Sequence, residues 1–173
     1  MKKSILKVVL LCFVLFAAGL SVHAQKEQTI QKGSQMLSYN LGYGWSWGGD
    51  RIGFIPAILT YDAGLWKIGP GTGTLGGMFM FSVKRNYINL YLAARGAWHI
   101  NFNIPKFDAF AGVTLGPKIP IYTYDITRRG IDWVGFNAFF GASYYFKPKF
   151  GVTTQFAVGL VNWYLIGLSF KLK

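Results

Sequence analysis

The chain has 173 residues, of which 52% are hydrophobic, 18% aromatic and only 14% charged. So much apolar mass has to be buried, which excludes a disordered chain, and the charged fraction is well below the roughly 25% of soluble domains. The 18 Lys and Arg residues outnumber the 6 Asp and Glu residues, for a formal net charge of +12, and the length suits one domain.

The first 24 residues have the pattern of a cleaved signal peptide. Three lysines come first, an apolar run follows over residues 8–20, and small residues lead up to Ala24. This pattern predicts cleavage between Ala24 and Gln25. The apolar run is shorter than the ~20 residues of a spanning helix, and Leu11 before Cys12 does not fit a lipoprotein signal. Cleavage removes the single cysteine, so no disulfide or thiol chemistry is expected afterwards.

Residues 25–34 are polar and are predicted to form a flexible periplasmic lead-in. From residue 35 onward, apolar residues alternate with small or polar ones, a pattern that places the two sets on opposite faces of a strand. Eight segments with this pattern follow in chain order, at 35–46, 52–65, 72–84, 87–100, 107–117, 132–146, 149–160 and 162–172.

The last two segments also have to be weighed against a helix, because residues 150–170 contain no charge and are long enough to span a membrane. The alternation has period two on both sides of Asn162, however. Two strands joined by a tight turn near Val161 and Asn162 explain that pattern better than one helix.

The second face of these segments carries Ser, Gly, Ala, Asn, Gln and Thr rather than charges. A soluble sandwich would expose charges there, whereas small neutral residues suit a narrow closed interior, and closure satisfies every backbone group in lipid. The sequence therefore predicts an all-β fold for residues 35–173, an eight-stranded antiparallel transmembrane β-barrel with up-and-down meander order. A helical membrane protein and a soluble barrel are the alternatives.

An even number of strands places both chain ends on the periplasmic side, with the longer loops outside. Residues 118–131 are then predicted to be the longest external loop. Pro56 does not fit the middle of a closed sheet and predicts a bulge or a late strand start. Tryptophans and tyrosines near strand ends, Trp163 among them, are predicted to lie in the aromatic girdles at the membrane interfaces.

Several runs along the chain resemble small bacterial outer-membrane β-barrels of the porin-like, OmpX/OmpA-type eight-stranded family. These runs are Leu92–His99, Asp108–Gly116, Phe140–Phe146 and the closing segment 159–170. The resemblance covers most of residues 35–173 and implies the fold and the outer membrane of a Gram-negative bacterium, but no activity. In that family the insertion machinery reads an aromatic residue at the end of the last strand, a role that Phe170 would take here.

Four ionisable residues are predicted to form a polar network in the lumen: Asp62, Arg95, His99 and Asp108. Alternation places Arg95 and His99 on the lumen face, and a symmetric turn over 101–106 would place His99 opposite Asp108. Such a group could be a proton path or a small polar site. A structural network is favoured, because buried charges have to be paired and narrow barrels fill their interiors with side chains.

No catalytic, cofactor-binding or metal-binding residues are predicted. A lipid A-modifying enzyme would need a histidine beside a serine and an acid, and His99 is the only histidine after cleavage. The basic residues are scattered over turns and termini, which does not indicate nucleic-acid binding. The predicted function is therefore a non-catalytic structural or surface-interaction barrel in contact with outer-membrane lipid, with a small porin or transporter as the alternative. Arg128 and Arg129 could contact lipopolysaccharide phosphates.

Overall fold

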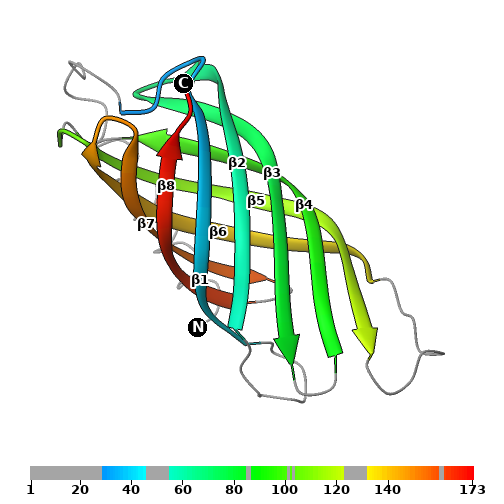
Figure 1. The fold of residues 1–173 in the computed structure, drawn as a ribbon. Helices are drawn as coiled ribbons and strands as arrows, with labels where there is room; N and C mark the ends of the chain where they lie inside the picture. The colour runs from blue at the N-terminus through cyan, green and yellow to red at the C-terminus, as the bar shows by residue number, and fades with distance from the viewer. Residues whose placement is uncertain are drawn as a thin grey trace, which may run out of the picture.

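The computed structural model describes residues 29–45, 55–84, 87–100, 102, 104–122, 132–159 and 162–173. Eight strands close into one barrel in sequence order, each antiparallel to its neighbours, with the first strand paired to the last. Figure 1 shows this barrel. The strands are β1 (Gln35–Trp45), β2 (Ile55–Ile68), β3 (Gly71–Lys84), β4 (Tyr87–Ile100), β5 (Phe107–Tyr122), β6 (Asp132–Lys147), β7 (Phe150–Gly159) and β8 (Asn162–Lys171). The predicted fold class is confirmed.

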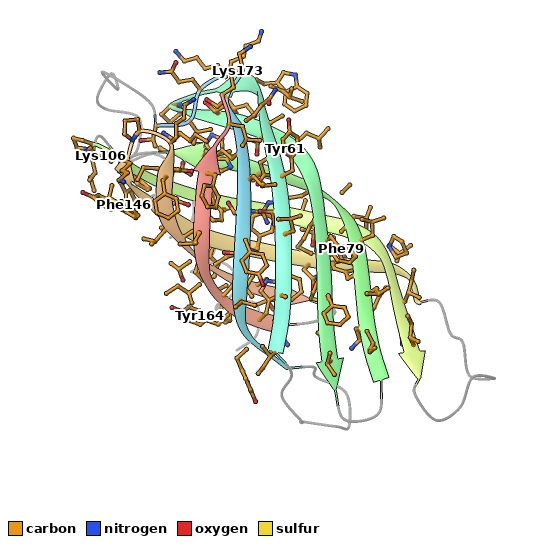
Figure 2. The ribbon with its side chains drawn as sticks, in the orientation of Figure 1. Tyr61, Phe79, Lys106, Phe146, Tyr164 and Lys173 are labelled. Atoms are coloured by element: carbon orange, nitrogen blue, oxygen red, sulfur yellow. The ribbon has the colours of Figure 1, made fainter. Side chains whose placement is uncertain are left out.

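The period-two pattern sets the two faces of the wall. Along β2, Thr60 and Asp62 are buried in the lumen. Leu59 and Tyr61, which alternate with them, are exposed on the outside of the wall. Tyr61, together with the other labelled aromatic side chains, points away from the barrel in Figure 2. Among the described residues, no helix is long and apolar enough to cross a membrane.

The wall is higher on one side than on the other. Strands β5 and β6 have 16 residues each, whereas β7 and β8 have 10 each. The longer strands extend further at the end of the barrel opposite the C-terminus (Figure 1).

Several strand limits differ from the predicted ones, and the largest difference is at the end of β5. β5 continues to Tyr122, so residues 118–122 belong to the wall and not to the predicted loop, because Ile119 and Ile121 keep the outward alternation and pair with β4. The described part of β2 begins at Ile55, which puts Pro56 at its second residue. Residues 51–54 lie outside the described part of the chain, and the register shift of β2 against β3 lies between Gly64 and Trp66 rather than at Pro56.

The prediction for Trp163 was wrong. Its side chain is 0% exposed and belongs to the apolar core of the lumen rather than to a girdle at the membrane interface. Its partners on the neighbouring strands are Gly44, which has no side chain, and Ala157, which has only a methyl group, so the indole has room inside the barrel.

Close approach of neighbouring strands requires glycine at position 76. A Cβ atom there would overlap the backbone carbonyl oxygen of Tyr61 and lie 2.9 Å from the Cα of Asp62. The next residue, Gly77, is different, since the nearest atom to a Cβ at that position is the carbonyl oxygen of Ala93 at 3.8 Å.

Residues 29–34 pack across the end of the barrel where the chain also ends. The Ile30 side chain is 2% exposed and packs with Met36 and Tyr145. Thr72 Oγ1 donates a hydrogen bond of 2.8 Å to the Ile30 carbonyl oxygen, which fixes the segment to β3. The structure therefore differs from the flexible lead-in predicted for this part of the chain, because Ile30 has an apolar pocket to fill.

Backbone hydrogen bonds also hold segment 29–34 across this end of the barrel, and we call this closure the seal. Gly33 N–H donates to Gly64 O and Gly64 N–H donates to Ser34 O, both at 2.8 Å, so the segment continues the ladder beside β2. The Lys171 Nζ atom donates to the Thr29 carbonyl oxygen at 2.8 Å. Segment 29–34 thus connects to β2, β3 and β8 at once.

We expect Ile30→Ala to open this seal without unfolding the barrel. Burial of an isoleucine side chain stabilises by about 2 kcal/mol, so amide exchange at Gly33 and Gly64 should accelerate by roughly thirtyfold. Hydrogen exchange of the reconstituted barrel measures this. Ile104→Ala, an exposed isoleucine at the same end, is the matched control and should leave both amides protected. Equal protection in the two variants would contradict the seal.

Candidate functional site in the barrel lumen

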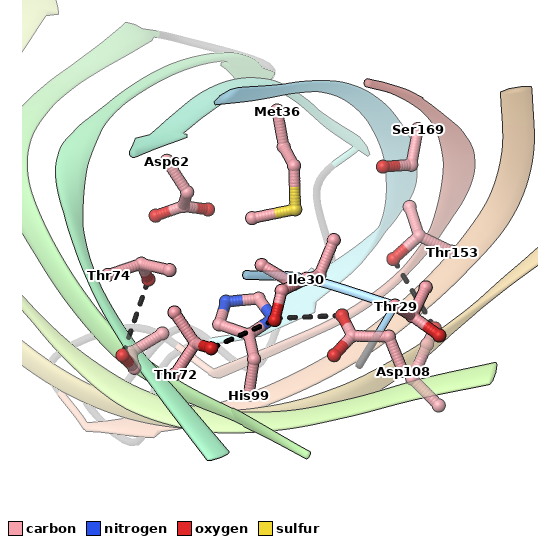
Figure 3. Close-up of polar contacts among 12 residues, drawn as sticks. Thr29, Ile30, Met36, Asp62, Thr72, Thr74, His99, Asp108, Thr153 and Ser169 are labelled. Carbon is pink, nitrogen blue, oxygen red and sulfur yellow. Dashed lines mark hydrogen bonds and ion pairs between the residues drawn. The ribbon is translucent and has the colours of Figure 1, made fainter. Parts of the chain in front are cut away.

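The lumen is divided into an apolar part and a polar part. The apolar part is a cluster of buried side chains contributed by seven of the eight strands: Ile58, Met78, Met80, Tyr91, Ala93, Ala97, Phe110, Phe139, Ala157, Trp163 and Leu165. The polar part lies nearer to the end closed by Ile30, and Figure 3 shows Asp62, Met36, Ser169, His99 and Asp108 around it. Side chains therefore fill the lumen along the described residues.

Arg95 bridges the barrel from β4 to strands on two other sides. Its Nε atom donates to Asp62 Oδ1 at 3.1 Å and Oδ2 at 2.9 Å, and its Nη1 atom donates to Gln155 Oε1 at 3.1 Å. The guanidinium carbon lies 3.7 Å from the ring centroid of Phe139, a cation–π geometry. Arg95 is 2% exposed, so its charge is balanced by Asp62 with little help from water.

His99 and Asp108 form a second buried pair. The His99 Nδ1 atom lies 2.8 Å from Asp108 Oδ2, and Asp108 is 2% exposed. The predicted register was wrong by two residues, because the structure pairs His99 with Phe110 across β4 and β5. Asp108 reaches His99 diagonally along the same lumen face. The turn between the strands is asymmetric, with φ values of 49° at Phe102 and 64° at Lys106, which shifts the register.

Hydroxyl groups complete the polar part. The Tyr145 hydroxyl lies 2.9 Å from Ser169 Oγ, and Ser38 Oγ donates to Ser169 Oγ at 3.0 Å. These hydroxyl groups link β1, β6 and β8, while the Arg95 bonds link β2, β4 and β7, and the His99–Asp108 bond links β4 and β5.

A small cavity of about 10 Å³ lies among these groups, room for about one water molecule. Asn40 Oδ1, His99 Nε2 and Gln155 Nε2 line it, and in the described residues none of the three has a protein hydrogen-bond partner. The cavity is polar but too small for a lipid or a sugar.

Catalytic and metal arrangements are not assembled in the described part of the chain. No hydroxyl hydrogen-bonds to His99 Nε2 there, so His99 and Asp108 lack the third member of a nucleophilic triad. No group of three or more His, Cys, Asp or Glu side chains that could hold a metal ion occurs in that part either.

All four residues predicted for the lumen network lie in the lumen, as Asp62 with Arg95 and His99 with Asp108. The predicted cleavage residues Ala24 and Gln25 and the basic loop residues Arg128 and Arg129 lie outside the described residues. Sequence reasoning missed Gln155 as the second acceptor for Arg95. Alternation along β7 predicts that Gln155 faces the lumen, but Arg95 lies on β4, which is not a neighbour of β7.

No family model and no curated protein matches the chain. Among solved structures it is similar to a de novo designed transmembrane β-barrel, with a TM-score of 0.59 and 15% identity over 83% of this chain and 98% of that chain. It is similar to Neisserial surface protein A, with a TM-score of 0.57 and 9% identity over 80% and 96% of the two chains. A third is the N-terminal β-barrel domain of Pseudomonas aeruginosa OprF, with a TM-score of 0.53 and 12% identity over 84% and 100%. At these identities the likeness shows the fold alone, and it confirms the predicted small-barrel fold.

Proposed function

We propose that this protein is an integral outer-membrane β-barrel of a Gram-negative bacterium, with a structural or surface-interaction role and neither transport nor catalysis. The outward rows of exposed apolar side chains, such as Leu59, Phe79 and Tyr164, support a lipid environment. The observation that carries the non-conducting role is the Arg95 bridge, because its hydrogen bonds cross the lumen from β4 to β2 and β7.

The orientation follows from the ends of the wall. Gln35 and Lys173 are hydrogen-bonded at one end, where short turns such as residues 69–70 and 148–149 also lie. In bacterial barrels that end faces the periplasm. Under this proposal the segment 123–131, with Arg128 and Arg129, faces outward and supplies lipopolysaccharide or surface-partner contacts.

Assembly would use the last strand. Phe170 points outward near the end of β8, and its ring centroid lies 5.0 Å from that of Phe150 on the adjacent strand. An exposed aromatic residue at this position fits the recognition signal for barrel insertion that the sequence resemblance implies, although Lys171, Leu172 and Lys173 follow it.

Planar-bilayer recording tests the proposal against its alternative. We expect no steady single-channel steps from the purified barrel, because side chains fill the lumen. A small porin would give reproducible steps and would overturn the non-conducting role. A heat-modifiable gel shift on the same sample is the control that a folded barrel was added.

Mass spectrometry of lipid A tests the enzyme alternative. Unchanged lipid A masses in cells with and without the protein would argue against a lipid A-modifying enzyme.

A further inference from the structure

The meander brings seven lysines together at the end of the barrel where the chain ends. Six of them have exposed side chains, and Lys171 is half-buried beside the Tyr145 ring, its Nζ atom 4.1 Å from the centroid. Figure 2 labels Lys106 and Lys173 at this end. We call this set the lysine rim: Lys32, Lys67, Lys106, Lys147, Lys149, Lys171 and Lys173.

Acidic side chains do not balance the lysine rim within the described residues. The only carboxylates with described side chains are Asp62 and Asp108, and both are buried in the lumen against Arg95 and His99. The positive charge of the lysine rim is therefore available to an external anion.

The lysines alternate with exposed apolar side chains at the same height. Trp66 precedes Lys67, Phe146 precedes Lys147, and Leu172 stands between the last two lysines. Trp66 is 54% exposed and Leu172 is 50% exposed. An apolar side chain beside a lysine fits the boundary between acyl chains and headgroups, where the lysine stem lies along apolar surface and its ammonium group reaches the phosphates.

From this arrangement we propose that the lysine rim binds anionic glycerophospholipid headgroups of the phosphatidylglycerol type in the leaflet that faces the periplasm. The inference rests on the proposed function for its orientation. The ammonium groups form charge-assisted hydrogen bonds to headgroup phosphates, and the apolar residues pack on the first acyl carbons.

Native mass spectrometry of the full chain, in micelles with equimolar phosphatidylglycerol and phosphatidylcholine, tests the proposal. Each lysine near an anionic lipid surface favours binding by about fivefold. We expect the wild type to retain more phosphatidylglycerol than phosphatidylcholine. The ratio of the two bound lipids should fall by at least about tenfold in the quadruple variant Lys67→Gln, Lys106→Gln, Lys147→Gln, Lys149→Gln. The side chains of these four lysines are exposed.

Two controls keep the outcome interpretable. The same four positions changed to arginine keep the charge and should keep the preference, and Lys118→Gln at the opposite end should leave it unchanged. An equal lipid ratio in the wild type and the glutamine variant would overturn the proposal. A gel shift on each sample reports the folded barrel, so this failure would be distinguishable from failure of the barrel assignment itself.

Discussion

Replacing Arg95 with methionine should lower the free energy of unfolding of the reconstituted barrel by about 3–5 kcal/mol. The change leaves the Asp62 carboxylate, which is 5% exposed, without its cation. It also removes the donor to Gln155 and the cation over the Phe139 ring. A buried charge without a partner is far more costly than a buried pair, which is why the loss exceeds that of an ordinary hydrogen bond.

The double variant Arg95→Met, Asp62→Leu separates pairing from packing. With both charges gone, most of the lost stability should return, because apolar residues of similar volume often replace a buried ion pair at little cost. Urea unfolding in lipid vesicles, followed by gel shift, measures both variants. Lys67→Met removes an exposed lysine and should change stability by less than about 0.5 kcal/mol. Wild-type stability of Arg95→Met would show that the bridge does not support the barrel.

Replacing Gly76 with alanine should destabilise the barrel by more than about 3 kcal/mol or prevent its closure. The new Cβ atom would overlap the Tyr61 carbonyl oxygen, and since the obstacle is backbone, no rotation of a side chain relieves it. Strands β2 and β3 would have to separate where Asp62 pairs with Gly76, beside the Arg95 bridge.

Gly77→Ala is the matched control one residue along. Its Cβ atom would have ordinary space, so the variant should stay within about 1 kcal/mol of the wild type. The folded fraction in a gel-shift assay, together with urea unfolding, compares the two variants even if Gly76→Ala folds poorly. Equal behaviour of the two alanine variants would contradict the requirement for close approach at residue 76.

The faces of the strands were predictable because alternation is a local property. It placed Asp62, Arg95 and His99 in the lumen correctly. The Asp62–Arg95 pair was also predictable, because only β3 separates β2 from β4. The hydrogen bond from Arg95 to Gln155 was not predictable, because it crosses the lumen between β4 and β7. The distance between these two strands depends on the curvature of the closed wall.

Turn geometry and end contacts account for the other differences. Among the described residues of the turn before Phe107, Phe102 and Lys106 have positive φ, which no simple pattern in the sequence of that turn indicates. Ile30 was the one apolar side chain in a polar lead-in, and its pocket exists only after the barrel has closed. The lysines were scattered along the sequence, and the meander gathers them because every second turn lies at the same end.

The unequal heights of the wall have a consequence for the surrounding bilayer. On β6, outward apolar residues run from Val134 to Phe146, whereas the row that begins with Tyr164 on β8 ends with Leu172, one residue beyond that strand. At about 3.3 Å per residue and a tilt of about 40°, these rows span about 30 Å and about 20 Å along the barrel axis. Lipid beside β8 therefore has to become thinner or the barrel has to tilt toward that side, so the protein imposes a gradient of membrane thickness around its own circumference.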